Sequence, residues 1–381
     1  MDVQLGARLD LEGGGIERLL AAEHGLQWIT GHHRRVASVE KASGSLYGLA
    51  YGDALGKPTE FQDYATIVAA YGPGGPRELT GDPALVTDDT QMMLAVGEAL
   101  VAADPLTPAS FEPVLRQAFL DWAASPDNNR APGMTCLRAC GDLADGRPWQ
   151  RASQIHSKGC GANMRVTPVG LLPGLTGDQR AGAAQLQAGL THGHATGLAA
   201  SELTAYAVRW LSDGLAPRDL LPGLRAHCAD QRLIYRGEWL GDLWQRPGVP
   251  TPEDFISRGW DECAAALDVV AGALRRGDPG GDPCLLTGAG WIAEEALATA
   301  LYCYLLTPDE PLTALGRAAA TSGDSDSIAC LAGGFAGAAL GMAAWPPAWR
   351  ERIEYADRLR ALGDAWDRFG DPPPETRPGR G

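Results

Sequence analysis

Glycine occupies every fourth position in two stretches that lie far apart in this chain. Because residues four apart share one face of an α-helix, each stretch predicts a helix with a groove free of side chains along one side. A glycine inside a helix costs roughly 1 kcal/mol relative to alanine, so several on one face need compensation, most simply from a closely packed second helix. The pattern therefore predicts a tightly packed helical core. The positions are Gly44, Gly48, Gly52 and Gly56 in the first stretch and Gly333, Gly337 and Gly341 in the second.

The rest of the chain also has a helical pattern. Stretches of helical length that are rich in alanine and leucine alternate with Gly/Pro breaks, and clear period-2 alternation of apolar residues is hard to find. Segments such as 71–76 and 246–252 fit loops between helices. We therefore predict an all-α fold, with helices around residues 87–103, 110–124, 196–213, 253–276, 287–306 and 327–344.

Composition and charge narrow the class of protein. The 381 residues are 45% apolar and 21% charged, which is ordinary for a globular protein and excludes disorder as the overall state. The formal net charge is −15 and the pI is near 4.9. A static nucleic-acid or anionic-membrane surface would need a basic face. We therefore expect no stable nucleic-acid surface.

Cysteine usage and apolar runs bear on the compartment. The eight cysteines show no CxxC pairing, which favours reduced thiols in a cytoplasmic protein. The N-terminus carries acids early and no continuous apolar segment, so no secretory signal is expected. The uncharged run 328–345 has the minimum length for a membrane span, but it is mostly Ala and Gly and follows two aspartates. We interpret it as a buried helix and expect no membrane partner.

Two acidic clusters stand at the starts of predicted helices. Thr87–Asp88–Asp89–Thr90 precedes one apolar helix, and Asp324–Ser325–Asp326–Ser327 precedes another. Either cluster alone is explained by helix capping, because Asp, Ser and Thr are favoured N-caps. Together they offer hard oxygen ligands that suit Mg²⁺, Mn²⁺ or Ca²⁺ better than zinc. If the two helix starts converge, a pair of divalent ions would relieve the repulsion among four carboxylates and activate a water.

Six motifs, in this order along the chain, resemble the ADP-ribosylglycohydrolase family, which includes the dinitrogenase-reductase-activating glycohydrolases. The resemblance covers roughly residues 41–345. It implies a compact all-α orthogonal multi-helix bundle with two divalent ions, usually Mg²⁺ or Mn²⁺. It also implies hydrolysis of the bond that joins C1″ of ADP-ribose to an acceptor. The motifs are GSLYGLAYGDALGKPTEF (44–61), TDDTQM (87–92), RAPGMT (130–135), KGCGANMRVTPVG (158–170), THGHA (191–195) and GDSDSIACLAGGFAGA (323–338).

The resemblance assigns roles by position. It implies that Glu60 is a mobile catalytic glutamate and that His192 lies on the substrate side. Ser327 stands where Thr is common, and Cys160 stands where some branches have Asn. Where some relatives carry an Asp before Gly133, this chain has Ala131–Pro132, so a role resting on that Asp does not transfer. The implied metal ligands are Thr87, Asp88, Asp89, Asp324, Asp326 and Ser327, and the implied diphosphate-binding turn is Ser157, Lys158, Gly159, Cys160 and Gly161.

This chemistry agrees with the residues themselves. Carboxylates stabilise the oxocarbenium-like state of ribosyl hydrolysis, and a glycine-bearing loop presents backbone N–H groups to a diphosphate without a basic patch. His192 and His194 flank one glycine but lack an obvious third zinc ligand, so we expect polar contacts at a helix start instead. Four tryptophans are candidates for stacking on adenine, although core packing is the more common role for any one of them. These tryptophans are Trp239, Trp244, Trp260 and Trp291.

Three functions fit these observations. The first is a metal-dependent hydrolase that removes ADP-ribose from a modified protein or another acceptor. The second is a catalytically silent ADP-ribose-binding or structural protein on the same fold. The third is a hydrolase of other ribosylated small metabolites. The intact acidic clusters and Glu60 favour an enzyme.

The resemblance also divides the chain. We expect an N-terminal extension over 1–40, an ADP-ribosylglycohydrolase domain over 41–363, and a Pro-rich C-terminal tail over 364–381. Apolar residues within 16–29 give the extension enough to pack on something. We hypothesise that it docks on the body or on a partner and takes no part in catalysis.

Overall fold

The computed structural model describes residues 39–370, and almost every element in this range is a helix. The six helices predicted above are all present, with ends shifted by a few residues. The segments predicted as loops, 71–76 and 246–252, lie between helices except for Tyr71, the last residue of α3, and Pro252, the first residue of α13. The helices are α2 Lys41–Gly56, α3 Tyr64–Tyr71, α4 Asp88–Ala102, α5 Pro108–Ala124, α6 Met134–Ala144, α7 Trp149–Ala152, η1 Cys160–Ala162, α8 Thr167–Leu171, α9 Gly177–Gly189, α10 Ala195–Ser212, α11 Pro217–Gln231, α12 Gly237–Leu240, α13 Pro252–Arg276, α14 Cys284–Thr287, α15 Ala293–Leu306, α16 Pro311–Ala319, α17 Ser325–Leu340, η2 Met342–Ala344, η3 Pro347–Trp349, α18 Ala356–Asp367 and η4 Arg368–Gly370.

Strands are absent from residues 39–370, where only isolated β-bridges occur. One bridge pairs Gln154 with His192 and another pairs Gly159 with Ile292, so both tie loops near the helix starts together. The predicted all-α class is confirmed. In the same range, no helix combines the length and the apolar composition that crossing a bilayer requires.

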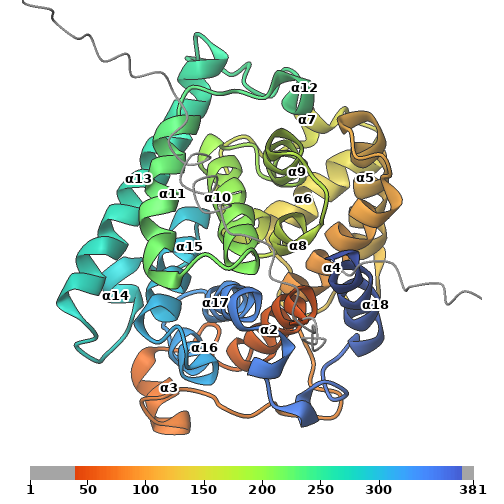
Figure 1. The fold of residues 1–381 in the computed structure, drawn as a ribbon. Helices are drawn as coiled ribbons and strands as arrows, with labels where there is room; N and C mark the ends of the chain where they lie inside the picture. The colour runs from red at the N-terminus through yellow and green to blue at the C-terminus, as the bar shows by residue number, and fades with distance from the viewer. Residues whose placement is uncertain (1–38, 371–381) are drawn as a thin grey trace, which may run out of the picture. The chain divides into compact units, whose positions relative to one another are not determined.

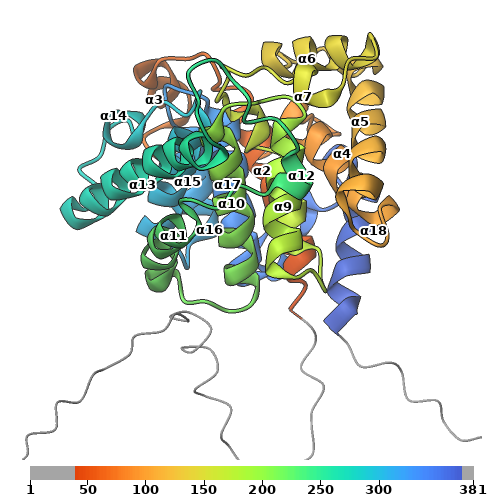
Figure 2. The same cartoon turned by 90° about the horizontal axis from the view of Figure 1, so that it is seen from above.

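The two glycine-spaced helices pack against each other backbone to backbone. α2 and α17 make the most extensive contact of any described helix pair, and both views show them side by side although they come from opposite ends of this range (Figures 1 and 2). A Cβ atom placed on Gly48 would lie 2.4 Å from the carbonyl oxygen of Gly333. One placed on Gly337 would lie 2.0 Å from the carbonyl oxygen of Gly44. No side chain larger than hydrogen fits there, which is the compensation that the spacing predicts.

The antiparallel direction of this pair decides where its ends meet. Gly56 closes α2 and lies against Asp326 in the first turn of α17, where an added Cβ would come within 2.4 Å of the Asp326 Cα. The Thr59 hydroxyl lies 2.9 Å from the Ser325 hydroxyl and 2.7 Å from the Gly56 carbonyl oxygen. The chain that leaves α2 is therefore held at the start of α17, which positions Glu60 beside the second acidic cluster.

Helix α10 lies in the interior of this body, in contact with α9, α13 and α17 (Figure 1). Much of its buried surface is alanine, in keeping with the small residues that dominate the core. The eight cysteines are all free, and seven of them are buried. Burial raises the pKa of each of these thiols, Cys263 and Cys330 among them, well above its usual range.

The C-terminal end of the predicted domain lies within a helix, whereas most of the predicted N-terminal extension lies outside the described residues. The expected boundary at residue 363 falls inside α18, whose Trp366 is buried against the core. The helix continues to Asp367, whose carboxylate accepts hydrogen bonds from the backbone N–H groups of Ala42 and Ser43. Residues 1–38 and 371–381, which hold the rest of the predicted extension and tail, lie outside the described residues.

Candidate metal centre and substrate pocket

The start of α4 is held by a buried carboxylate from α2. Thr87 is the N-cap of α4, and its hydroxyl accepts a hydrogen bond from the Asp89 N–H at 3.3 Å. Asp53, fully buried on α2, accepts hydrogen bonds from the Thr87 N–H at 2.9 Å and from the Thr90 hydroxyl at 2.5 Å. Thr87 and Asp53 therefore satisfy the start of α4. The Asp88 and Asp89 carboxylates are not used for capping, and Asp88 Oδ2 accepts a hydrogen bond from the Gly133 N–H at 3.1 Å. Asp53 was not among the predicted site residues, although an acid inside a glycine-spaced apolar helix is a detectable signal.

The start of α17 has two carboxylates that cap little. Asp324 is at the N-cap position but makes no side-chain capping bond. Asp326 accepts one hydrogen bond at 3.0 Å from the N–H of Ser327. All three residues are buried, with exposed fractions of 8% or less. Capping therefore does not explain this cluster.

The two helix starts converge on one pocket. Carboxylate oxygens of Glu60, Asp324 and Asp326 lie within 4.8 Å of one another. Asp88, Asp89 and Ser327 line the same cavity, whose volume is about 310 Å³. The implied ligand Thr87 is buried behind them and does not line it. The cavity is lined by Glu60, Phe61, Asp88, Asp89, Ala131, Pro132, Gly133, Met134, Thr135, Cys136, Gly159, Cys160, Gly161, Met164, His192, Trp291, Asp324, Asp326 and Ser327.

Crowding of these carboxylates disfavours their charged forms. Burial, followed by repulsion from Asp326, raises the pKa of Glu60 to about 9. Burial is also the main cause that raises the pKa of Asp88 to about 7. The pKa values of Asp89 and Asp324 are raised well above their usual range by burial and by the neighbouring carboxylates. Within residues 39–370 no salt bridge neutralises these carboxylates, and a bound cation would favour their charged forms.

The donor set fits a hard divalent cation. Asp89 has a buried carboxylate oxygen, Oδ2, without a hydrogen-bond partner among the described residues. A buried unpaired carboxylate oxygen is costly, and coordination of a cation is one of the few ways to satisfy it. Oxygen ligands at this density suit Mg²⁺, Mn²⁺ or Ca²⁺. The residues present are therefore compatible with the metal dependence that the sequence implies.

In metal-free buffer we expect the melting temperature to fall as the pH rises from neutral to about 9. Asp88 and Glu60 ionise at about 7 and about 9 in the folded protein, whereas the same groups ionise at about 4 in an unfolded chain. The native state therefore holds extra protons. The stability they provide is complete below about pH 4 and is lost as the pH rises through the folded values.

Excess Mg²⁺ is expected to reduce the decrease of the melting temperature with rising pH, because a bound cation replaces the protons on the carboxylates. Thermal unfolding followed in EDTA and in Mg²⁺ at several pH values measures the effect. The buried thiols also favour protonation, but they contribute equally in both buffers. Equal slopes with and without metal would contradict the prediction.

A loop bearing two glycines forms another wall of the pocket. Gly159, Cys160 and Gly161 line the cavity. The Cys160 N–H donates to the Trp291 carbonyl oxygen at 3.1 Å, and the Gly159 N–H lies 3.4 Å from the Ser157 hydroxyl. Two of the backbone donors expected to reach a diphosphate are therefore engaged within the protein.

Lys158 and Ser157 lie beside the pocket and do not line it. The Lys158 ammonium pairs with Glu262 at 2.6 Å and with Glu294, which is buried. The Ser157 hydroxyl lies 2.9 Å from the hydroxyl of Thr135. In this arrangement Lys158 anchors the loop to α13 and α15, so its charge is already neutralised.

Two aromatic rings stand at the mouth of the pocket. Phe61 and Trp291 stack with ring centroids 5.5 Å apart and planes 17° from parallel. They are 65% and 43% exposed, which is unusual for large apolar side chains. Phe61 also has a left-handed backbone, with φ of 64°, a conformation that non-glycine residues rarely adopt. Of the four tryptophans considered above, Trp291 is the one on this pocket, while Trp239 and Trp260 are buried.

The two histidines of the THGHA motif have different positions. His194 is the N-cap of α10, and its Nδ1 accepts a hydrogen bond from the Thr196 N–H at 3.2 Å, as expected for a helix start. His192 is 2% exposed and lines the pocket. Burial, with the positive charge of Arg165 second, holds the pKa of His192 well below its usual range. The His192 ring is therefore neutral.

Comparison with known proteins places this arrangement in a family. The model of the family ADP-ribosylglycohydrolase matches residues 34–375. The chain belongs to that family. The uncharacterized protein YegU of Escherichia coli is 27% identical over 338 residues, which are 84% of this chain and 93% of YegU. The mouse (Mus musculus) ADP-ribosylhydrolase ARH3 is 24% identical over 371 residues, 87% of this chain and 92% of its own.

A solved structure supports the fold of this chain. A chain of an ADP-ribosylglycohydrolase-related protein complex superposes with a TM-score of 0.62 at 21% identity. The match covers 88% of this chain and 99% of the other. The expected fold and family are both confirmed.

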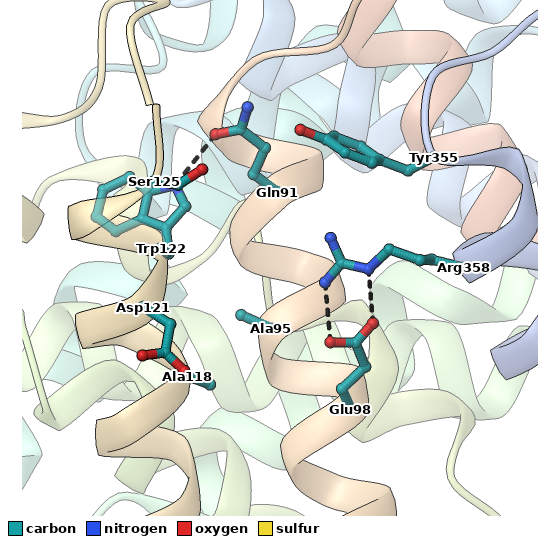
Figure 3. Close-up of a pocket in the computed structure, with 9 residues that line it drawn as sticks. All are labelled: Gln91, Ala95, Glu98, Ala118, Asp121, Trp122, Ser125, Tyr355 and Arg358. Atoms are coloured by element: carbon teal, nitrogen blue, oxygen red, sulfur yellow. Dashed lines mark hydrogen bonds and ion pairs between the residues drawn. The ribbon is translucent and has the colours of Figure 1, made fainter. Parts of the chain in front are cut away.

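A second pocket lies between α4, α5 and the start of α18 (Figure 3). Gln91, one turn after the acidic cluster, faces it and accepts a hydrogen bond from the Trp122 ring N–H at 3.2 Å. Arg358 spans the pocket to Glu98 with two bonds of 2.7 and 2.8 Å. The charged groups drawn in Figure 3 are thus largely paired with each other, and none of the implied site residues lines this pocket.

Proposed function

We propose that this protein is a metal-dependent hydrolase that removes ADP-ribose from a modified acceptor by cleaving the bond at C1″. The acceptor is an ADP-ribosylated protein or another ADP-ribosylated molecule. The observation that carries this proposal is the convergence of Glu60, Asp324 and Asp326, with Asp88 and Asp89, on one pocket in a member of this family. Free cysteines throughout the body favour a cytoplasmic protein.

Two cations are proposed to occupy the pocket. Asp88 and Asp89 at the start of α4 and Asp324 and Asp326 at the start of α17 would hold them, with hydroxyl oxygens from Thr87 and Ser327. When bound, divalent cations orient ribose hydroxyls and lower the pKa of a water molecule. The carboxylates alone would repel one another and an incoming diphosphate, so the pocket needs this positive charge to accept ADP-ribose.

The protein's own side chains supply the remaining steps. Glu60 lies at the pocket and is only partly buried, so it is placed to hold or release a proton at the acceptor or at the attacking water. Developing positive charge on the ribose is stabilised by the surrounding carboxylates. His192 and the glycines of the 159–161 loop contact the substrate at its diphosphate side. Phe61 and Trp291 limit access of bulk water at the mouth.

A panel of ADP-ribosylated substrates tests the proposal. Arginine-, serine- and nucleobase-linked ADP-ribose, together with a ribosylated metabolite, would be assayed for release of free ADP-ribose with Mg²⁺, with Mn²⁺ and with EDTA. Release that needs metal supports the proposal, and the preferred linkage identifies the acceptor. Tight ADP-ribose binding without turnover on any linkage would instead indicate a binding protein. Turnover confined to the metabolite would indicate the third function.

Glu60→Gln is expected to lower kcat by about 100-fold or more, the range for loss of a proton-transferring group. The amide keeps the shape of the side chain but cannot exchange a proton. Because the aspartates still hold metal, the rise in melting temperature on adding Mg²⁺ should persist. Steady-state kinetics and thermal unfolding measure both effects. The exposed Glu78→Gln serves as the control, and an unchanged kcat for Glu60→Gln would remove Glu60 from the reaction.

A further inference from the structure

Arg165 is a fully buried arginine beside the pocket that none of the steps above uses. It follows η1 and precedes α8, and no carboxylate forms a salt bridge with it in the described range. A guanidinium has five N–H donors and no acceptor, and it stays charged. The guanidinium lies 4.3 Å from the centroid of the Phe119 ring, but an arginine buried without a carboxylate partner still calls for an explanation.

Each donor of Arg165 has a partner. Nε donates to the side-chain oxygen of Gln187 at 2.8 Å, and Nη2 donates to the Gln187 carbonyl oxygen at 2.7 Å. Nη1 points at the sulfur atoms of Met92 and Cys136, at 3.4 and 3.5 Å. The remaining hydrogen of Nη2 goes to the hydroxyl of Thr191 at 2.8 Å. Arg165 therefore fixes the Thr191 hydroxyl as an acceptor.

The Thr191 hydroxyl has one proton to give. Its oxygen lies 2.8 Å from Nδ1 of His192, an ordinary hydrogen-bond distance, and 3.5 Å from the carbonyl oxygen of Ala188, at the limit. The proton therefore goes to His192 Nδ1, which must be unprotonated to accept it. In a neutral imidazole the ring proton is then on Nε2.

His192 Nε2 lies next to Gly159 and Gly161, which line the pocket together with His192. Cβ atoms built on Gly159 and Gly161 would lie 3.3 and 3.4 Å from it, so the two glycines leave room around this nitrogen. No residue in the range 39–370 accepts a hydrogen bond from Nε2. The proton is thus available to a molecule in the cavity.

We propose that Arg165 is a positioning residue, which acts through the Thr191 hydroxyl to hold His192 as the Nε2–H tautomer, a neutral donor for a phosphate or ribose oxygen of the ligand. The identity of that ligand rests on the proposed function, whereas the tautomer does not. A neutral donor suits this pocket, because His192 can then bind an anionic ligand without gaining or losing a proton. The orientation of its ring is set by groups outside the cavity.

We call the hydrogen-bond chain from Arg165 through Thr191 to His192 the relay. Replacing Arg165 would remove five hydrogen bonds at once and endanger folding. Thr191→Val and Thr191→Ser therefore test the relay instead. Valine keeps the shape of threonine without the hydroxyl, and serine keeps the hydroxyl. Thr204→Val is the matched control, since Thr204 is equally buried on α10 and its hydroxyl has no partner in the described range.

Nitrogen NMR of ¹⁵N-histidine-labelled protein gives the first measurement. The wild-type protein, Thr191→Ser and Thr204→Val should show His192 with a bare Nδ1 and a protonated Nε2, and Thr191→Val should lose this preference. A wild-type spectrum with the proton on Nδ1, or an unchanged spectrum in Thr191→Val, would overturn the relay. His192→Gln assigns the signal.

Isothermal titration calorimetry of ADP-ribose binding in the presence of Mg²⁺ is the second measurement. We expect Thr191→Val to weaken binding by about 10-fold, the value of one hydrogen bond, and Thr191→Ser to retain most of the affinity. Equal affinity for wild type and Thr191→Val would overturn the role of His192 as a positioned donor. Wild-type protein that binds no ADP-ribose would overturn the proposed function, while the NMR result would still decide the relay.

Discussion

Asp326→Asn is expected to lower turnover by about 1,000-fold or more and to abolish the rise in melting temperature on adding Mg²⁺. The pKa values of Glu60, Asp89 and Asp324 are raised first by burial and second by the charge of Asp326, which places Asp326 at the centre of the cluster. The amide keeps the volume and removes the charge, so a bound cation loses a ligand. Activity assays with titrated Mg²⁺ and thermal unfolding measure the two effects.

The same change is expected to stabilise the metal-free protein. Removing one of several buried carboxylates reduces the electrostatic repulsion in the native state. The melting temperature in EDTA should therefore rise while activity falls. These opposite signs distinguish loss of a ligand from simple misfolding. Asp357→Asn, on the exposed face of α18, should change neither quantity. Turnover that survives both Asp326→Asn and exhaustive chelation would exclude a metal centre here.

Gly52→Ala is expected to destabilise the protein by about 3 kcal/mol or more, the upper range for overpacking a core. A Cβ on Gly52 would lie 2.0 Å from the Ala329 carbonyl oxygen, so α2 and α17 would have to move apart. Because the packing of α2 against α17 positions Glu60 and the two acidic clusters, the affinity for metal should fall together with the stability. Urea unfolding and Mg²⁺ titration of the folded fraction measure these losses.

Gly141→Ala provides the matched control. Gly141 lies inside α6, is exposed, and would have nothing within 4 Å of an added Cβ. Alanine there should stabilise the protein by about 0.5–1 kcal/mol through its helix propensity. Equal stability of the two variants would show that the contact between α2 and α17 is not as close as the structure has it.

The sequence predicted those parts of the fold that local patterns determine. Helix positions follow from apolar periodicity and from Gly/Pro breaks, and the contact of α2 with α17 follows from glycines that share a face. The six predicted ranges leave out several helices, α9 and α11 among them, and the shortest, α7, α12 and α14, have four residues each and no periodicity to detect. The extent of α18 was also hidden, since its last turn runs directly into the proline-rich segment at 372–374.

The site was predictable where its residues stand together in the sequence. Asp88 and Asp89 are adjacent, and Asp324 and Asp326 are separated by one residue, whereas Asp53 stands alone and gains its role from the fold. Pairings between distant residues leave no sequence pattern either. Lys158 meets acids 104 and 136 positions away, so its neutralised charge appears only in three dimensions.

The stacking of Phe61 on Trp291 joins the two sides of the pocket mouth in the same way. Each ring alone is an ordinary aromatic residue in the sequence, and core packing explains a tryptophan as well as a ligand contact does. The 43% exposure of Trp291 distinguishes the two, and exposure is a property of the folded chain.

The buried, protonated cysteine thiols can be used to measure local opening of this protein. Cys330 lies on α17 behind the carboxylates, Cys263 lies on α13, and Cys140 lies on α6. A thiol reagent reaches each of them only when its surroundings open, because both access and thiolate formation are suppressed in the closed state. Peptide mapping after a brief alkylation pulse would therefore show which helices a divalent ion holds shut and which it leaves free to open.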